Sequence, residues 1–243
     1  MLGSLALHEY LFLMSSLIKE TYPRIRSFIL RDSRPTAGQT HIMETKWDSY
    51  CLDPDKNVDY AQVFGRDAPI ILEIGFGNGS SLAATAEANP DINYIGIEVH
   101  TPGVGHLMLL LEEKGLTNVR IYHHDAIEIL EQRITDKLLT GIHLFFPDPW
   151  HKRRHHKRRI VRPSFIKLVR EKLKPNGYFH AATDWEHYAH EMLKILSSTS
   201  NSLVNSSADN RFCPRPDYRP LTKFESRGLR LGHGVWDLIF KNP

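Results

Sequence analysis

From residue 70 onward, short apolar segments alternate with helical segments, and this alternation constrains the fold more than any other feature of the sequence. The first apolar segment, Ile70–Ile74, has the continuous hydrophobicity of a strand that is buried on both faces. The predicted strands are 70–74, 93–98, 119–123, 141–146, 178–183 and 234–240, with 197–207 as a loop or a further edge strand. The predicted helices between them are 80–88, 104–114, 126–132, 163–173 and 185–196. This order predicts an α/β fold: a doubly wound, mostly parallel, seven-stranded sheet with helices on both faces.

The first 65 residues lack this alternation, because prolines and glycines interrupt any period. We therefore expect an N-terminal extension, 1–65, followed by one domain, 66–243. Residues 1–20 are apolar, but they have no basic start and are interrupted by His8 and Glu9, so they are too short and broken to cross a membrane. A peripheral helix or a frayed tail is expected there; alternatively, Met14 is the true start.

Positive charge is concentrated in one segment. Of the 31 Lys and Arg residues in the chain, seven lie between His151 and Arg162, where no acid accompanies them. Without those seven charges the net charge of +3 would become −4, so a mildly acidic protein carries one cationic segment. Such a segment suits the phosphates of a nucleic acid, although a solvated basic helix face would have the same composition.

The cysteines and histidines show no metal-binding pattern. Cys51 and Cys213 lie far apart in the sequence and form no CxxC motif, which favours a reducing, cytoplasmic location without disulfides. The 14 histidines are not spaced with carboxylates or thiolates in a way that would hold a metal ion. We therefore expect no metal.

Three of the predicted strands end in groups that suit a nucleoside-containing ligand. The loop Glu73–Gly79 reads EIGFGNG, and its glycines Gly75, Gly77 and Gly79 would let the backbone approach a ligand at the start of a helix. At the second strand end, Glu98 could accept hydrogen bonds from ribose hydroxyls. At the third, Asp125 could accept one from an adenine amino group. Because parallel strands end at one edge of a sheet, these groups predict a single site.

The end of the fourth strand argues against a dinucleotide. Phe146–Trp150 reads FPDPW, which places Asp148 between two prolines and beside an indole. Prolines stiffen this loop, and a rigid carboxylate beside an aromatic plane suits a planar heterocycle with hydrogen-bond donors. NAD remains the alternative ligand, since a glycine loop followed by an acid also suits that cofactor.

Several motifs together resemble the bacterial tRNA (guanine-N7)-methyltransferase family. They are RSFILRDSRPTAGQ (26–39), EIGFGNG (73–79), GIEVH (96–100), HHDA (123–126), FPDPWHKRRHHKRR (146–159), ATDW (182–185) and TKFESRG (222–228). The glycine loop alone would indicate only the Rossmann-like fold of methyltransferases that use S-adenosyl-L-methionine, whereas the FPDPW segment and the TKFE segment are more specific.

The resemblance implies a site and a substrate. The implied cofactor is S-adenosyl-L-methionine and the implied substrate is guanosine 46 in the variable loop of tRNA. Cofactor contacts are implied at Glu73, the glycine loop, Glu98, Asp125 and Asp148, and Asp148 is the implied active-site acid. Substrate contacts are implied at Lys152, Asp184, Thr222, Lys223, Phe224 and Glu225. RNA contacts are implied at Arg154, His155, His156, Lys157, Arg158 and Arg159, and the extension is a further candidate for RNA contact.

Guanine N7 already carries a free lone pair, so its methylation needs no strong general base. A carboxylate matches the N1–H and N2 amino donors of guanine. Asp148, alone or with Asp184 or Glu225, is therefore expected to hold the base and to offset the charge that develops on the ring. The alternative from another class is a non-catalytic RNA-binding protein with a methyltransferase-like fold. Monomer and homodimer are both open.

Overall fold

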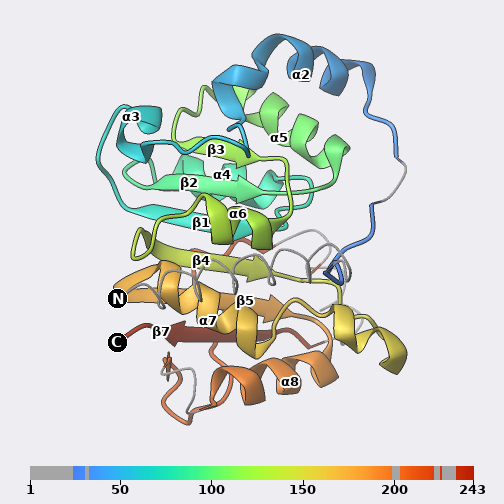
Figure 1. Ribbon diagram of the computed structural model, residues 1–243, viewed down its shortest axis with the longest axis vertical. Coiled ribbons are helices and arrows are strands. Elements are labelled where there is room, and N and C mark those ends of the chain that lie inside the picture. Colours follow the sequence, from blue (N-terminus) through green and yellow to red (C-terminus); the bar gives the residue numbers. More distant parts are fainter. Residues whose placement is uncertain (1–23, 31–32, 199–202, 222–224, 226–233) are drawn as a thin grey trace, which may run out of the picture.

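A seven-stranded sheet forms the centre of the computed structural model, which describes residues 24–30, 33–198, 203–221, 225 and 234–243 (Figure 1). Within these residues the strand order is β3-β2-β1-β4-β5-β7-β6. The strands from β3 to β5 are parallel to their neighbours, whereas β7 is antiparallel to both β5 and β6. The strands are β1 (Ile70–Ile74), β2 (Asn93–Ile97), β3 (Val119–Tyr122), β4 (Leu139–Phe145), β5 (Leu173–Thr183), β6 (Val204–Asn205) and β7 (Trp236–Lys241).

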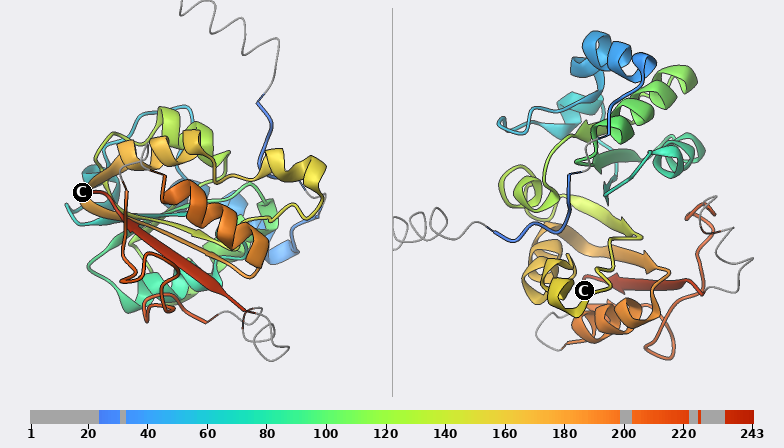
Figure 2. Two further views of the ribbon diagram at one scale, coloured as in Figure 1. Left: turned by 90° about the horizontal axis from the view of Figure 1, so that it is seen from below. Right: turned by 90° about the vertical axis from the view of Figure 1, so that its right-hand side faces the viewer.

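Helices cover both faces of this sheet (Figure 2). They are α2 (Ala37–Tyr50), α3 (Tyr60–Phe64), α4 (Ser80–Ala88), α5 (Thr101–Lys114), α6 (Ala126–Gln132), α7 (Pro163–Lys172) and α8 (Glu186–Leu196), with a 3₁₀ helix, η1 (Arg153–Arg158). Side chains of α2, α4 and α5 share one hydrophobic cluster, and those of α6, α7 and α8 share another. The doubly wound fold expected from the sequence is thus confirmed.

The predicted helices and strands from residue 70 onward agree with the structure within three residues at each end, except at the start of β5. In the region 197–207, expected as a loop or edge strand, the described residues contain the two-residue strand β6. There residues 174–177, which separate the predicted helix 163–173 from the predicted strand 178–183, lie inside the strand, as an irregularity between the pairs Leu139↔Leu173 and Gly141↔Tyr178. Asn176 takes a left-handed φ of 64° in this segment. Residues 174–177 therefore interrupt the pairing of β5 with β4, but β5 is paired with β4 both before and after them.

Helix α2 was not anticipated from the sequence. Thr36 and Gln39 form a capping box at its start, in which each side chain accepts a backbone N–H of the other residue. The helix packs on α5, where the Tyr50 hydroxyl donates to Glu112 at 2.6 Å. The T-x-x-Q pattern was a visible signal, but α2 buries only Ile42 and Tyr50 fully, so its apolar period is weak.

The order of the strands reverses at β1. From β1 the chain first builds outward through β2 and β3, and then returns to add β4 on the other side of β1. The loops after β1 and β4 consequently lead to opposite faces, which is where parallel sheets bind ligands. All the strand ends singled out in the sequence lie along this edge.

The start of α5 touches the loop after β1 so closely that only glycine fits. A Cβ atom added to Gly103 would lie 2.1 Å from the carbonyl oxygen of Gly77. Gly79 makes a second close contact with this helix, since a Cβ atom there would lie 2.6 Å from the Cβ atom of Leu107. The glycine loop is therefore held in place partly by the backbone of α5.

We predict that Gly103→Ala lowers the free energy of unfolding by about 1–3 kcal/mol, the usual cost of overpacking. Gly38→Ala is the matched control, because a Cβ atom there meets nothing within 4 Å and alanine favours a helix. Denaturant melts of both variants measure the difference. Equal stability of the two variants would show that the contact between α5 and the glycine loop is not tight.

Candidate active site

The loop between β1 and α4 has the open backbone that its glycines predict. Gly75, Gly77 and Gly79 have φ values of 72°, 62° and 74°, a left-handed region that other residues rarely adopt. The N–H of Gly77 donates to Glu98 at the end of β2, at 2.8 Å. The glycine loop after β1 is thus tied to the neighbouring strand end.

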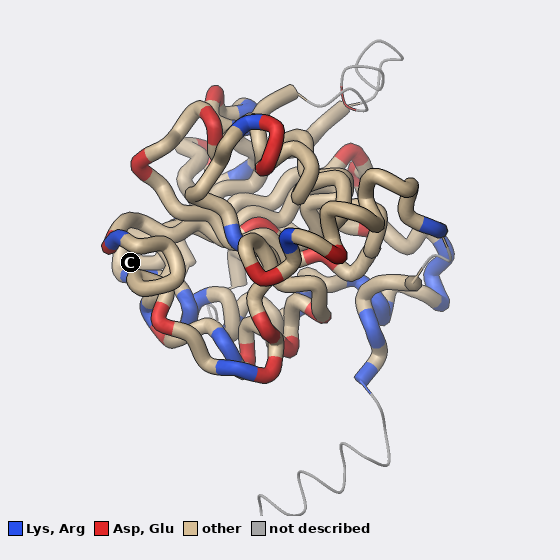
Figure 3. Tube along the Cα trace, turned by 90° about the horizontal axis from the view of Figure 1, so that it is seen from above, with Lys and Arg blue, Asp and Glu red and all other residues tan. Residues whose placement is uncertain are grey.

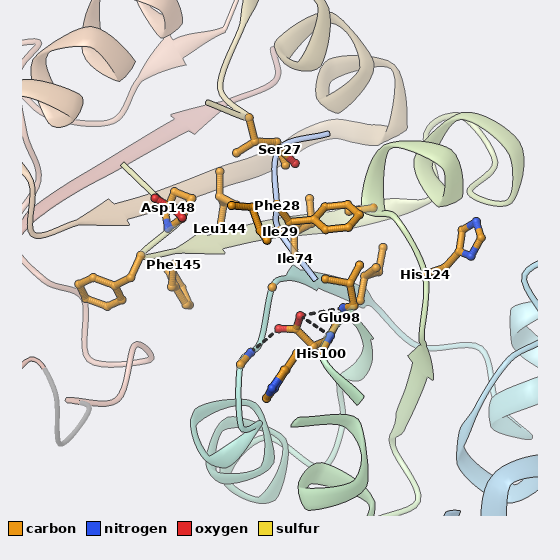
Figure 4. A pocket seen from close by; sticks show the side chains of 18 residues that line it. Ser27, Phe28, Ile29, Ile74, Glu98, His100, His124, Leu144, Phe145 and Asp148 are labelled. Atoms are coloured by element: carbon orange, nitrogen blue, oxygen red, sulfur yellow. Dashed lines mark hydrogen bonds between the residues drawn. The ribbon is translucent and has the colours of Figure 1, made fainter. Parts of the chain in front are cut away.

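Glu98 holds the surrounding backbone in place and is also a candidate ligand-binding residue (Figure 4). One carboxylate oxygen accepts the backbone N–H groups of Val99 and His100, and the other accepts that of Gly77. A carboxylate offers about four acceptor positions, so one remains for a ligand. Glu98 therefore keeps one acceptor position for a hydrogen-bond donor of a ligand.

Two cavities meet at the switch between β1 and β4. The first, of about 440 Å³, lies beside Glu98 and His100 and is also lined by Asp148 (Figure 4). The second, of about 750 Å³, lies beside Glu73 and the start of α4. They share the walls Gly75, Gly77, Phe145 and Phe146. One elongated ligand could therefore span both cavities across the glycine loop.

Glu73 is a buried acid without a partner. Its side chain is 4% exposed and lines the second cavity, and no hydrogen bond to it exists among the described residues. Burial, together with the charge of Glu98, raises the pKa of Glu73 to about 8. A buried carboxylate of this kind is costly unless a cation or donor pairs with it. The second cavity is therefore suited to a ligand with a positively charged group.

Asp125 does not face an open cavity. It caps α6 by accepting the N–H of Ile127 at 2.9 Å, and its other oxygen is paired with Arg24. Arg24 belongs to the segment 24–30, whose Ser27, Phe28 and Ile29 line the first cavity. The position where the sequence suggested an adenine amino group is thus taken by a guanidinium in this structure.

Asp148 projects from a constrained loop. Phe146 and Trp150 have left-handed φ values of 51° and 47°, which are unusual for residues other than glycine and are typical of functional sites. One oxygen of Asp148 accepts the N–H of Trp150 at 3.0 Å, and its side chain is exposed to the first cavity. The N–H of Phe146 is bound to the carbonyl of Ala182 on β5 at 2.8 Å. The loop therefore has fixed ends and a solvent-accessible carboxylate between them.

Trp150 connects this loop to the N-terminal segment and to η1. Its indole is 6% exposed and donates to the Ser27 carbonyl at 3.2 Å. The guanidinium of Arg158 lies over its ring, 5.1 Å from the centroid. The indole that the sequence places beside Asp148 is thus buried and anchors the loop.

The cationic segment forms η1 and lies at the edge of the molecule (Figure 3). Lys152, Arg154 and Lys157 are exposed, and Arg158, His155 and His156 are partly buried. Arg159 differs, because it is 1% exposed. Its guanidinium pairs with Glu191, donates to the Pro149 carbonyl at 2.9 Å and lies over Tyr188. This corrects the expectation for Arg159: it joins the FPDPW loop to α8 and cannot reach an RNA.

Asp184 and Glu225 do not meet Asp148 in one cavity. Asp184 borders a third cavity, of about 770 Å³, which shares only Phe146 and Pro147 with the first. Glu225 is 2% exposed, and Arg219 donates to both of its carboxylate oxygens at 2.7 Å. Thr222, Lys223 and Phe224 lie outside the described residues.

Arg219 was not anticipated from the sequence. It is 1% exposed and also contacts both oxygens of Asp237, at 2.7 and 3.0 Å. Burial alone would raise the pKa of Asp237, but hydrogen bonds from His180 and Arg219 outweigh it and lower that pKa. Arg219 thereby joins Glu225 to Asp237 on β7. Nothing in the local sequence distinguishes it from a surface arginine.

In the part of the chain that the structure describes, no group of three or more His, Cys, Asp or Glu side chains could hold a metal ion. Among the same residues, no helix has the length and apolarity needed to span a bilayer.

Sequence comparison gives close relatives over most of the chain. Residues 67–238 match the model of a family described as "Putative methyltransferase". The chain is 56% identical over 219 residues to the tRNA (guanine-N(7)-)-methyltransferase of Shewanella oneidensis, covering 90% of this chain and 92% of that protein. It is 56% identical over 218 residues to the protein of the same name from Methylococcus capsulatus, covering 90% and 94%.

Solved structures with a similar fold are more distant in sequence. The 16S rRNA methyltransferase KamB has a TM-score of 0.55 at 14% identity, covering 77% of this chain and 94% of that one. A 30S ribosomal A1408 methyltransferase from an uncultured bacterium has a TM-score of 0.52 at 18% identity, covering 76% and 95%. At such identities the likeness concerns the fold alone.

The unpartnered Glu73 predicts a specific dependence of stability on pH. Its folded-state pKa of about 8 lies above the ordinary value of 4.5, so the folded protein binds a proton that the unfolded chain releases. Wild type should therefore lose stability relative to Glu73→Gln as the pH rises from about 5 to 7.5, by roughly 1.4 kcal/mol per pH unit. Denaturant melts across this range measure the difference.

Glu113→Gln is the control for this experiment, because Glu113 is an exposed acid on α5. Its difference from wild type should not change with pH over the same range. A flat difference for Glu73→Gln as well would mean that Glu73 is solvated or paired.

Proposed function

The chain belongs to the tRNA (guanine-N(7)-)-methyltransferase family, and we propose that it transfers a methyl group from S-adenosyl-L-methionine to N7 of guanosine 46 in the variable loop of tRNA. The observation that supports this most directly is the pair of joined cavities at the reversal of the strand order. One cavity offers an acceptor for a ribose, and the other offers a buried carboxylate without a partner.

The residues present fit the cofactor. Its α-ammonium group is the cation that the carboxylate of Glu73 lacks, and its ribose is a donor for the remaining acceptor position of Glu98. The left-handed glycines between them let a ligand lie against the backbone. When bound, S-adenosyl-L-methionine supplies an electrophilic methyl group on a sulfonium.

The protein's task in this reaction is positioning. Because guanine N7 already has a lone pair, no side chain has to remove a proton before attack. Rate enhancement then comes from holding N7 in line with the methyl group and from stabilising the charge that develops on the base. Asp148 suits the second role, since its carboxylate is exposed to the first cavity and its loop is fixed by Phe146 and Trp150.

The cationic η1 segment is proposed to bind the tRNA backbone. Its exposed side chains, Lys152, Arg154 and Lys157, follow the FPDPW loop directly, so phosphates bound there lie near the site. Guanosine 46 must leave its neighbours to reach the enzyme, which costs a few kcal/mol. Phosphate contacts beside the site can offset that cost.

We also propose that the enzyme works in the cytoplasm, as a monomer or homodimer, and without a metal. Cys51 and Cys213 are both free thiols, as in proteins of reducing compartments. Attack by a neutral lone pair needs no metal-bound water.

Transfer of a radiolabelled methyl group to unmodified tRNA, followed by nucleoside mapping, tests the proposal. The expected product is 7-methylguanosine at position 46, formed only with S-adenosyl-L-methionine present. Label at another atom or position would contradict the assigned substrate, and tRNA binding without any methyl transfer would favour a non-catalytic RNA-binding protein.

The exposed part of η1 should control the salt dependence of tRNA binding. We predict that the double variant Arg154→Ala, Lys157→Ala weakens binding and flattens the slope of log Kd against log salt by up to about two units, about one for each lost phosphate contact. Filter-binding titrations at several salt concentrations measure the slope. Removal of two other exposed lysines, Lys56 and Lys167, is the control and should leave it unchanged.

Asp148→Asn should lower kcat by at least roughly 100-fold, the scale of losing one preorganised electrostatic partner. Affinity for S-adenosylhomocysteine should change little, because the amide keeps the size of the side chain. An unchanged kcat in a folded variant would contradict the electrostatic role of Asp148.

A further inference from the structure

The second cavity is bordered by a segment that comes from far along the chain. Most of its lining belongs to β1, the glycine loop, the start of α4 and the end of β4, but Arg219, Pro220 and Leu221 also line it. The same cavity contains Glu73, the buried acid that suits the α-ammonium group of the cofactor. Residues 218–221, named the wall segment here, are therefore placed to enclose the amino-acid end of that ligand.

Side-chain contacts hold the wall segment, because it forms neither helix nor strand. Arg219 is 1% exposed and donates two hydrogen bonds to Asp237 on β7, at 2.7 and 3.0 Å. It donates two more to Glu225, both at 2.7 Å. Its backbone N–H donates to the Pro216 carbonyl at 3.0 Å, and its carbonyl accepts from Arg215 at 2.6 Å. Both the side chain and the backbone of Arg219 are thus fixed.

His180 on β5 connects Asp237 to the wall segment a second time. Burial lowers the pKa of His180, so its ring is neutral and carries one proton. The carboxylate of Asp237 can only accept, so this proton lies on Nε2, 2.7 Å from Asp237. The other ring nitrogen, Nδ1, then accepts from the Tyr218 hydroxyl at 3.0 Å. Two successive residues, Tyr218 and Arg219, therefore bind the wall segment to the sheet.

Aromatic rings of β4 and of the loop after it support the same two residues. The ring of Tyr218 lies almost parallel to that of His143, with 5.7 Å between centroids. The guanidinium of Arg219 lies 5.9 Å from the ring centroid of Phe145 and 5.6 Å from that of Phe146. Because Phe145 and Phe146 line both cavities of the site, a displaced Arg219 would alter the walls that the two cavities share.

We propose that Arg219 is a positioning residue for the cofactor, which fixes the wall segment so that Pro220 and Leu221 enclose the amino-acid end beside Glu73. This rests on the proposed function. The role of Arg219 is indirect, since four of its five N–H donors already bind Glu225 and Asp237. Enclosure excludes water, and the attraction between an ammonium group and the Glu73 carboxylate is stronger in a dry cavity.

The variant Arg219→Lys and a pair of ligands test this role. S-adenosylhomocysteine has the amino-acid end, whereas 5′-methylthioadenosine keeps the adenosine and the thioether without it. Lysine keeps the charge but lacks the planar fork that binds two carboxylates. Calorimetry should show that affinity for S-adenosylhomocysteine falls by at least about 10-fold, the scale of one charge-assisted hydrogen bond, and that affinity for 5′-methylthioadenosine is unchanged. Equal losses for both ligands, or no loss for either, would overturn the proposal.

The variant Leu221→Ala tests the enclosure without disturbing the buried network, and it decides the proposal if Arg219→Lys does not fold. Leu221 is 46% exposed, so its truncation should leave the melting temperature at the wild-type value. Affinity for S-adenosylhomocysteine should fall about 3- to 10-fold, because the ligand would cover less apolar surface. Affinity for 5′-methylthioadenosine should again stay the same. Unchanged affinity for S-adenosylhomocysteine would show that the wall segment does not enclose the amino-acid end.

Arg120→Lys is the matched control. The guanidinium of Arg120, on β3, donates to the backbone carbonyls of Thr117, Val119 and Val63, and it lines neither the first nor the second cavity. This variant should lose stability and keep both affinities. A selective loss of affinity for S-adenosylhomocysteine in this control as well would overturn the assignment to Arg219.

These outcomes are separate from the test of the proposed function. If wild type binds S-adenosylhomocysteine and forms 7-methylguanosine at position 46, but Arg219→Lys and Leu221→Ala keep the wild-type affinities, only the positioning proposal fails. If wild type binds neither ligand, the proposed function fails first.

Discussion

The reversal of the strand order at β1 is the constraint on which the site depends. Because β2 and β4 pair with opposite sides of β1, the loops that follow β1 and β4 must separate, and the cavities form where they do. Glu98 then ties the β2 end to the glycine loop by accepting three backbone N–H groups. The order of the strands therefore determines where the cavities form, and side chains such as Glu98 fix the positions of the loops around them.

Buried arginines fix the parts of the site that do not belong to strands. Arg159 joins the FPDPW loop to α8, and Arg219 joins Glu225 to Asp237 on β7. Each guanidinium is almost fully buried and has carboxylate partners, which is the condition under which a buried charge is tolerated. Basic residues of the same sequence segment thus have different roles. Arg159 is buried and supports the FPDPW loop, whereas Arg154 and Lys157 are exposed to solvent.

The regular elements could be predicted from the sequence because each has a local signal. The run Ile70–Ile74 and the glycines after it are sufficient to define β1 and its loop. The weak apolar period of α2 was not sufficient, although its capping box was present. Long-range pairing could not be foreseen either, since nothing near Asp125 in the chain indicates Arg24, and nothing near Glu225 marks Arg219 as its partner. The ring contact between Trp185 and His151 likewise joins residues that lie 34 positions apart in the sequence.

A crystal structure with S-adenosylhomocysteine would test the account of the site most directly. The measured quantity is the distance from the amino nitrogen of the ligand to the nearest carboxylate oxygen of Glu73. We predict a hydrogen bond of about 2.7–3.2 Å, with the ribose at Glu98 and the ligand spanning both cavities across Gly75 and Gly77. A ligand confined to one cavity, with Glu73 still without a partner, would contradict it.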